Sequence, residues 1–204
     1  MSFFSKITAK SWEHAGETEG VHGEYVVVRS AGQMGLWMFL AVISSFFMLF
    51  IISYYTRSQF PDWEKLADPG ILWTNTAVLV LASIALQIAS NAARRSAAVR
   101  MRNALIAGGL LTLVFVAGQL LAWDQLATAG FYAADNPATA FFYLLTGLHA
   151  LHLLGGLWFM IVLGFRLNRD TQKEKALQAV TLCTTYWHYL LLVWLILFFL
   201  LLRT

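Results

Sequence analysis

Five long apolar runs, separated by polar segments, follow the first 31 residues of the chain. They cover about residues 34–55, 71–89, 104–123, 138–165 and 179–202. An α-helix rises about 1.5 Å per residue, so a run of roughly 20 residues crosses the hydrocarbon core of a bilayer. The pattern predicts an all-α membrane protein: a bundle of five transmembrane helices in residues 32–204, preceded by a polar N-terminal segment, residues 1–31.

The composition agrees with this prediction. Hydrophobic residues make up 59% of the chain, charged residues 12%, and the mean hydropathy is +0.64. Eight tryptophans and seven tyrosines suit a protein that crosses two membrane–water interfaces. A single cysteine excludes a disulfide framework or a thiolate metal site made by this chain alone. The start, MSFFSKITAK, is followed by polar and acidic residues, so we expect no signal peptide.

Basic residues gather in two of the four connecting segments. The first loop has only Arg57 and Lys65, and the third has no basic residue. Because positive loops stay in the cytoplasm, the second and fourth loops are expected there, with the N-terminus inside and the C-terminus outside. The residues concerned are Arg94, Arg95, Arg100 and Arg102 in the second loop, and Arg166, Arg169, Lys173 and Lys175 in the fourth.

The fourth run contains FFYLLTGLHALHLLGG, residues 141–156, with His149 and His152 three residues apart. A histidine at membrane depth is costly and usually has a partner or a function. The two rings point to the same side of one helix, so a bis-histidine haem needs a ligand from elsewhere, and His188 is the membrane-embedded candidate. A copper or non-haem iron site would have only these three histidines. One hypothesis is therefore a small histidine-ligated haem-binding electron carrier.

The same segment also suits contacts between helices, and we favour this interpretation. The small residues near the histidines would let a neighbouring helix approach, and the imidazoles and the Thr146 hydroxyl could then form hydrogen bonds of roughly 1 kcal/mol each. Gln119 and Trp123, four residues apart, form a polar and aromatic face on the third run. A transporter is disfavoured because the interiors of the five runs lack Asp, Glu, Lys and Arg.

Taken together, four motifs resemble those of subunit III of haem–copper terminal oxidases. TGLHALHLLGG (146–156) and TYWHYLLLVWLILF (185–198) resemble its two signature stretches. Gly118-Gln119 followed by Trp123 resembles a third motif, and WTNTAVLVLASIALQIA (73–89) resembles the polar start of the preceding helix. The likeness runs from about Gly35 to the C-terminus with the motifs in the same order. It corresponds to the five-helix form of the family, which lacks the first two of seven helices.

The resemblance implies a non-catalytic accessory subunit of a proton-pumping oxidase that reduces oxygen to water. In that family the haems and copper belong to subunits I and II, and subunit III binds none of them. It packs mainly against subunit I, protects the oxygen-reducing site during turnover, supports proton uptake and holds structural phospholipids. Further implied partners are subunit II and a small subunit IV, with no nucleic acid. The implied location is the bacterial cytoplasmic membrane, as a multi-pass protein.

The resemblance also implies roles for individual residues. Arg166 and Arg169, just after the fourth run, match positions where the family meets lipid head groups. Many members carry a carboxylate in the helix that matches the first run. The corresponding segment here, Ile43–Ser45, has no acidic residue, so this chain cannot perform whatever role that carboxylate has in other members. The missing helices leave a flank for lipid, a small subunit or helices of subunit I. The expected packing residues are Trp73, Asn75, Gln119, Trp123, Thr146, His149, His152, Gly155, Gly156, Tyr186, Trp187, His188 and Trp194.

Overall fold

Five long α-helices dominate the part of the chain described by a computed structural model, residues 31–63, 70–134, 136–169 and 173–203. Each contains a stretch long and apolar enough to cross a membrane, and no strand occurs among the described residues. The prediction of an all-α protein with five membrane-spanning helices is thus confirmed. The helices are α2 (Ala31–Arg57), α3 (Ile71–Arg94), α4 (Ala98–Thr128), α5 (Pro137–Arg169) and α6 (Lys173–Arg203).

All five helices extend beyond the apolar runs that predicted them. The helix α4, for example, begins at Ala98 and ends at Thr128, so it includes Arg100, Arg102 and Asp124. Hydropathy detects only residues that tolerate hydrocarbon, whereas backbone hydrogen bonds continue into the interface, where charged side chains meet water. Apolar runs therefore locate the spans but underestimate the helices.

Two tight turns end the helices α3 and α4 in the same way. After α3, Ser96 has a φ of 55°, and its N–H and that of Ala97 bond back to carbonyls of the last helical turn. After α4, Gly130 has a φ of +87° and forms the equivalent bonds together with Phe131. This pairing is the Schellman motif, which needs a left-handed residue just beyond the helix. The turn at Ser96 reverses the chain within a few residues, so α3 and α4 form a hairpin.

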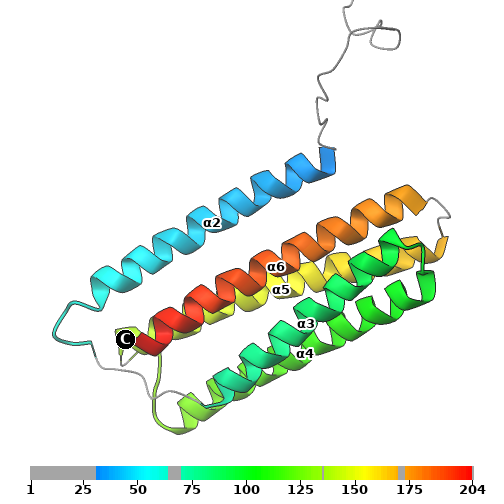
Figure 1. Ribbon diagram of the computed structural model, residues 1–204. Coiled ribbons are helices and arrows are strands. Elements are labelled where there is room, and N and C mark those ends of the chain that lie inside the picture. Colours follow the sequence, from blue (N-terminus) through cyan, green and yellow to red (C-terminus); the bar gives the residue numbers. More distant parts are fainter. Residues whose placement is uncertain (1–30, 64–69, 135, 170–172, 204) are drawn as a thin grey trace, which may run out of the picture. The chain divides into compact units, whose positions relative to one another are not determined.

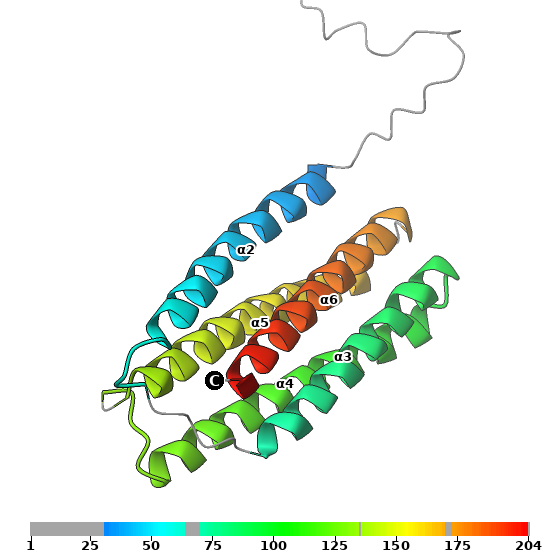
Figure 2. The same ribbon diagram turned by 60° about the vertical axis from the view of Figure 1, so that its left-hand side comes forward.

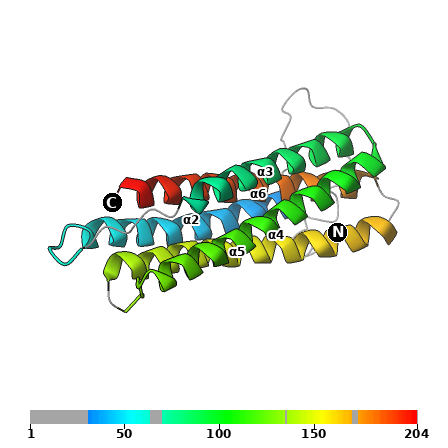
Figure 3. The same ribbon diagram turned by 90° about the horizontal axis from the view of Figure 1, so that it is seen from below.

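The helices α3, α4, α5 and α6 form a four-helix arrangement, which is seen from three directions in Figures 1, 2 and 3. The helix α3 contacts α4 and α6, and α5 contacts the same two helices. Among the described helices, α2 contacts only α5 and α6. It buries one stripe formed by Leu40, Ile43, Phe47 and Tyr54, spaced as one face of a helix requires. The helix α2 is therefore an outer addition to a four-helix core.

The described helices alternate in direction, so their ends collect at two levels. The α3–α4 turn lies at the same end as the end of α5 and the start of α6, while the C-terminal end of α2 and the end of α6 lie at the opposite end (Figures 1 and 2). The segments predicted to be basic loops thus share one end. Which end faces the cytoplasm stays a prediction.

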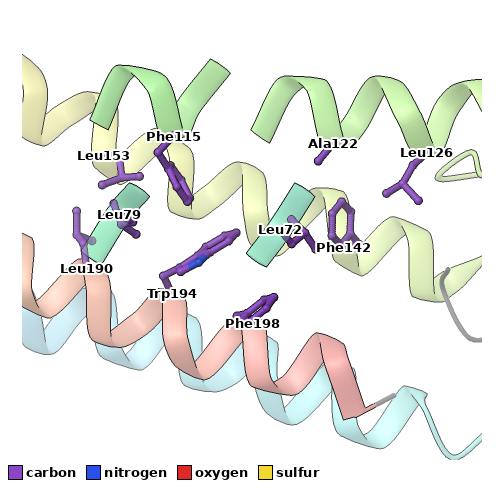
Figure 4. Packing of buried hydrophobic residues seen from close by; sticks show 10 residues of the cluster. All are labelled: Leu72, Leu79, Phe115, Ala122, Leu126, Phe142, Leu153, Leu190, Trp194 and Phe198. Carbon is purple, nitrogen blue, oxygen red and sulfur yellow. The ribbon is translucent and has the colours of Figure 1, made fainter. Parts of the chain in front are cut away.

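Most of the interior is made of apolar side chains, contributed by all four core helices. Figure 4 shows the main cluster, in which Trp194 of α6 lies among residues of α3, α4 and α5. Its ring meets that of Phe115 edge to face, with centroids 4.8 Å apart. Many large apolar residues, such as Trp158 at 71% exposure, point outward instead. A lipid-facing surface explains this pattern, because hydrocarbon surrounds the outer face of a membrane-spanning bundle.

Candidate functional site

Hydrogen bonds from tryptophan to threonine connect the four core helices. Each indole N–H donates to a threonine hydroxyl on another helix. An indole can only donate, so the direction of these bonds is fixed. The pairs are Trp187 of α6 with Thr112 of α4 (3.1 Å), Trp194 of α6 with Thr76 of α3 (3.0 Å), and Trp123 of α4 with Thr146 of α5 (3.1 Å).

The three threonines are already oriented by their own helices. Thr76, Thr112 and Thr146 each donate the hydroxyl proton to the carbonyl four residues earlier, at 2.8, 2.9 and 2.6 Å. The oxygen then has lone pairs free to accept from the indole. Each threonine therefore uses its donor within one helix and its acceptor between two helices. In hydrocarbon, where water offers no alternative partner, such bonds help helices to associate.

His149 lies inside the four-helix core with no exposed surface. Its ring packs against Phe115 of α4, with centroids 6.0 Å apart, and against Trp194 of α6, with centroids 5.2 Å apart. Neither ring nitrogen has a hydrogen-bond partner among the described residues. The structure thus brings His149 together with the aromatic residues of α4 and α6.

Gln119 of α4 and Asn75 of α3 are both buried polar side chains. Gln119 of α4 is 1% exposed and Asn75 of α3 is 4% exposed. Both amide atoms of Gln119 and the amide nitrogen of Asn75 lack partners among the described residues. Asn75 packs against Gly118, where a Cβ would lie only 2.8 Å from the Asn75 Cγ. Glycine at position 118 therefore makes room for the Asn75 amide.

His152 has different surroundings, although it lies only three residues from His149. Its Nδ1 pairs with the carbonyl of Leu148 at 2.7 Å. The centroid of its ring lies 5.6 Å from the ring centroid of Phe47 on α2. The hydroxyl of Tyr186 on α6 donates to the His152 carbonyl at 3.0 Å. His149 thus faces the core, whereas His152 lies at the contact of α5 with α2 and α6.

The glycines at the end of the histidine motif differ sharply from each other. A Cβ on Gly156 would lie 2.8 Å from ring atoms of both Tyr186 and Trp187. A Cβ on the exposed Gly155 would meet nothing within 4 Å. Gly147 is intermediate, because its Cβ would lie 3.5 Å from the Trp123 ring. The close approach of α6 to α5 therefore depends on Gly156.

The family model described as "Cytochrome c oxidase subunit III" matches residues 2–203. This chain belongs to the cytochrome c oxidase subunit III family. The resemblance inferred from the motifs is thereby confirmed. Membership places the chain in a multi-subunit complex, and the five apolar helices make it a multi-pass membrane protein.

Relatives of this subunit III chain come from plants and bacteria. It is 29% identical to "Cytochrome c oxidase subunit 3" of Arabidopsis thaliana over 191 residues, which are 88% of this chain and 70% of that protein. It is 32% identical to "Probable cytochrome c oxidase subunit 3" of Mycobacterium tuberculosis over 123 residues, 60% of this chain and 61% of that protein. The Synechocystis protein is 26% identical over 194 residues, 91% of this chain and 79% of that protein.

In this subunit III chain, His188 lies on an exposed part of α6, and its Nδ1 pairs with the Thr184 carbonyl at 2.7 Å. His149 is inside the core, so the two histidines have unlike surroundings. Among the described residues, no group of three or more His, Cys, Asp and Glu side chains could hold a metal ion. Trp73 is also exposed, although its ring meets Phe198 edge to face at 4.9 Å.

A hydroxyl contact lies in the segment Ile43–Ser45, which has no acidic residue. Ile43 is buried, and the hydroxyl of Ser44 lies 2.8 Å from that of Tyr189 on α6. Ser44 also donates to the Leu40 carbonyl at 2.8 Å. This pair links α2 to the core without a charge. Arg166 and Arg169 lie on the last turns of α5, but their side chains are outside the described part of the chain.

The sequence analysis included Thr146, which accepts from Trp123, but it missed the other two threonines that pair with indoles in this subunit III chain. The expected packing residues do not include Thr76, Thr112 or Thr184. The Thr184 hydroxyl donates to the Leu86 carbonyl of α3 at 3.2 Å. Hydroxyl residues are common in membrane helices and bond to their own backbone, so none stands out by type. The usable signal was position, because Thr112 shares a helical stripe with the buried Phe115 and Gln119.

Proposed function

We propose that this chain is the non-catalytic accessory subunit of a proton-pumping haem–copper terminal oxidase that reduces oxygen to water. In this role it stabilises subunit I, supports its proton uptake and retains bound phospholipids. The observation that carries the proposal is the use of intramembrane polar groups in contacts between helices. Trp123, Trp187 and Trp194 each donate to a threonine of another helix, and Tyr186 donates to the backbone of α5.

The helix interiors also support an indirect role in proton transfer. A chain that carried protons itself would normally have ionisable residues along a path through the membrane. The apolar runs of this chain have no Asp, Glu, Lys or Arg. We therefore assign proton transfer, together with the haems and copper, to partner subunits I and II. A small subunit IV is a further proposed neighbour.

The charge distribution supports the retention of anionic phospholipids and a location in the bacterial cytoplasmic membrane. Arg166 and Arg169 belong to the end of α5, which lies at the same end of the bundle as the α3–α4 turn. That turn is flanked by Arg95 and Arg100, both exposed. Clusters of basic residues beside a membrane attract anionic head groups, and they favour the cytoplasmic side. We propose Arg166 and Arg169 as head-group ligands.

The experiment is purification of the affinity-tagged chain from its native membrane, followed by haem, copper and phospholipid analysis. We expect the chain to co-purify with haem- and copper-containing subunits, and we expect His188→Ala to leave the haem absorbance per complex unchanged. Replacing Arg166 and Arg169 by Gln should lower the phospholipid content while the haem content stays constant. If the chain purified alone with one b-type haem that His188→Ala abolished, it would be an electron carrier and the proposal would fail.

The accessory role itself is tested by removing the chain. A strain without this subunit should still assemble subunits I and II with their haems, because those subunits hold the redox centres. Its oxidase should lose activity faster during sustained turnover than the complete enzyme does. Oxygen consumption followed over many turnovers measures this loss. An oxidase whose activity decayed equally with and without the chain would contradict the proposed protection of subunit I.

A further inference from the structure

We propose that the four-helix core binds ordered water between Gln119 of α4 and His149 of α5, with the amide of Asn75 on α3 as a third hydrogen-bonding partner. The bound molecule is neutral, and it both donates and accepts hydrogen bonds. The inference concerns the interior of this chain and is independent of what the subunit does for the oxidase.

The first observation is a set of buried polar atoms without partners. They are both amide atoms of Gln119, both ring nitrogens of His149 and the amide nitrogen of Asn75. The three residues are exposed by 1%, 0% and 4%, respectively. Buried polar groups in proteins are nearly always hydrogen-bonded, to protein or to ordered water. Such atoms, gathered in one bundle, therefore point to ordered water that supplies partners for several of them.

The second observation is the register of α4 against α5, from which we infer that Gln119 lies opposite His149. One turn before Gln119, Phe115 contacts the His149 ring. One turn after it, Trp123 donates to Thr146, which lies three residues before His149. The helices α4 and α5 are consecutive and antiparallel, so these two contacts fix their register (Figures 1 and 2). Gln119, between the two contacts, faces the segment from Thr146 to His149.

The third observation places Asn75 at the same level of the bundle. Its amide packs against Gly118, the residue before Gln119. The next residue of α3, Thr76, accepts a hydrogen bond from Trp194, whose ring lies 5.2 Å from that of His149. The three polar side chains thus come from three helices and converge on one layer, which also contains the central indole shown in Figure 4.

The chemistry of these atoms matches water better than a direct contact. A neutral imidazole has one donor and one acceptor on separate sides of its ring, so one Gln119 amide cannot satisfy both. A direct hydrogen bond between Gln119 and His149 would also leave the amide N–H groups of Asn75 without an acceptor. A water molecule donates two hydrogen bonds and accepts two, and buried waters typically make about three. Such a mixed set of partners is provided by the Gln119 amide oxygen, a ring nitrogen of His149 and the amide nitrogen of Asn75.

The test is a cryo-electron microscopy map of the complete oxidase at a resolution that shows ordered water. We expect a density peak within hydrogen-bonding distance, roughly 2.7–3.2 Å, of both Gln119 and His149. Direct contact of the two side chains with no peak between them would overturn the proposal. This measurement uses the unaltered protein, so it decides the question even if the variants below do not assemble.

A mutant cycle in the same complex gives a second, independent readout. Gln119→Met and His149→Leu should each lower the apparent melting temperature of the subunit by roughly 4 °C, because each leaves the shared water with too few partners. The double variant should lose no more than either single variant, because both partners of the water are then gone. Full additivity of the two losses would show that the residues share no ligand, and the proposal would fail.

Thr139 provides the matched control for the cycle. Its hydroxyl is also buried without a partner among the described residues, but it lies ten residues before His149 on α5, about 15 Å along the helix. Thr139→Val combined with Gln119→Met should therefore give additive losses. Non-additivity as large as that of the Gln119 and His149 pair would indicate a general loosening of the bundle and would overturn the assignment of a local water site.

Discussion

Two neighbouring glycines of α5, Gly155 and Gly156, should respond in opposite ways when each is replaced by alanine: one substitution should stabilise the subunit and the other should destabilise it. The Cβ of Gly156→Ala would lie 2.8 Å from ring atoms of Trp187 and Tyr186. Carbon atoms pack best at about 3.5–4.0 Å, so the new methyl group is about 0.7 Å too close. Trp187 cannot easily move, because it is 1% exposed and bonded to Thr112. The Cβ of Gly155→Ala would meet nothing within 4 Å.

The magnitudes follow from two effects. Overpacking a tight contact costs roughly 1–3 kcal/mol, whereas exchanging glycine for alanine inside a helix gains up to about 1 kcal/mol. Gly156→Ala should therefore destabilise the subunit by about 1–2 kcal/mol, and Gly155→Ala should stabilise it by up to about 1 kcal/mol. In a domain of this size, about 1 kcal/mol shifts the melting temperature by roughly 2–4 °C.

The assay is the thermal release of the subunit from the purified oxidase, followed by gel filtration of heated samples. Gly155→Ala is the matched control, because it makes the same chemical change one residue away. The variants should melt in the order Gly156→Ala, wild type, Gly155→Ala. If Gly156→Ala were as stable as Gly155→Ala, the close contact of Gly156 with Trp187 and Tyr186 would not exist in the membrane, and the reasoning would be wrong.

Two further predictions concern the indole bonds and the α2–α3 loop. Thr112→Val leaves the Trp187 N–H without an acceptor, at a cost of about 1 kcal/mol, and should lower the subunit's melting temperature by roughly 2–4 °C. The control is Thr128→Val at an exposed position, which loses only hydrogen bonds within α4 and should change the melting temperature little. Arg57 donates to Asp62 at 2.7 Å and so lowers the carboxyl pKa below 3.8. The folded state then binds the proton less tightly than the unfolded chain, so the pair's stabilisation should be present above pH 3.8 and lost as pH falls through the lowered pKa. Melting curves over a pH series should show the wild type losing its small advantage over Asp62→Asn at low pH, and an advantage that persisted there would contradict the ion pair.

Hydropathy was sufficient to predict five membrane-spanning helices, because a bilayer imposes a length and a polarity on every helix that crosses it. The site was only partly accessible from the sequence. Trp187 and Trp194 could be selected as packing residues, but their acceptors could not, since any hydroxyl on a neighbouring helix would serve. The two adjacent glycines, Gly155 and Gly156, look alike in the sequence. Only the packing of α6 on one side of α5 distinguishes them.

The indole–threonine pairs also determine how the bundle can respond to its bilayer. Without a hydrophobic force between helices in lipid, packing and interhelical hydrogen bonds together hold each helix at its axial position. The bonds of Trp187 and Trp194 lie seven residues apart on α6, about 10 Å along its axis, and connect it to two different helices. Sliding by one turn, about 5.4 Å, would break both bonds. A thinner or thicker membrane should therefore tilt the four core helices together, as a single rigid body, instead of shifting one helix past another.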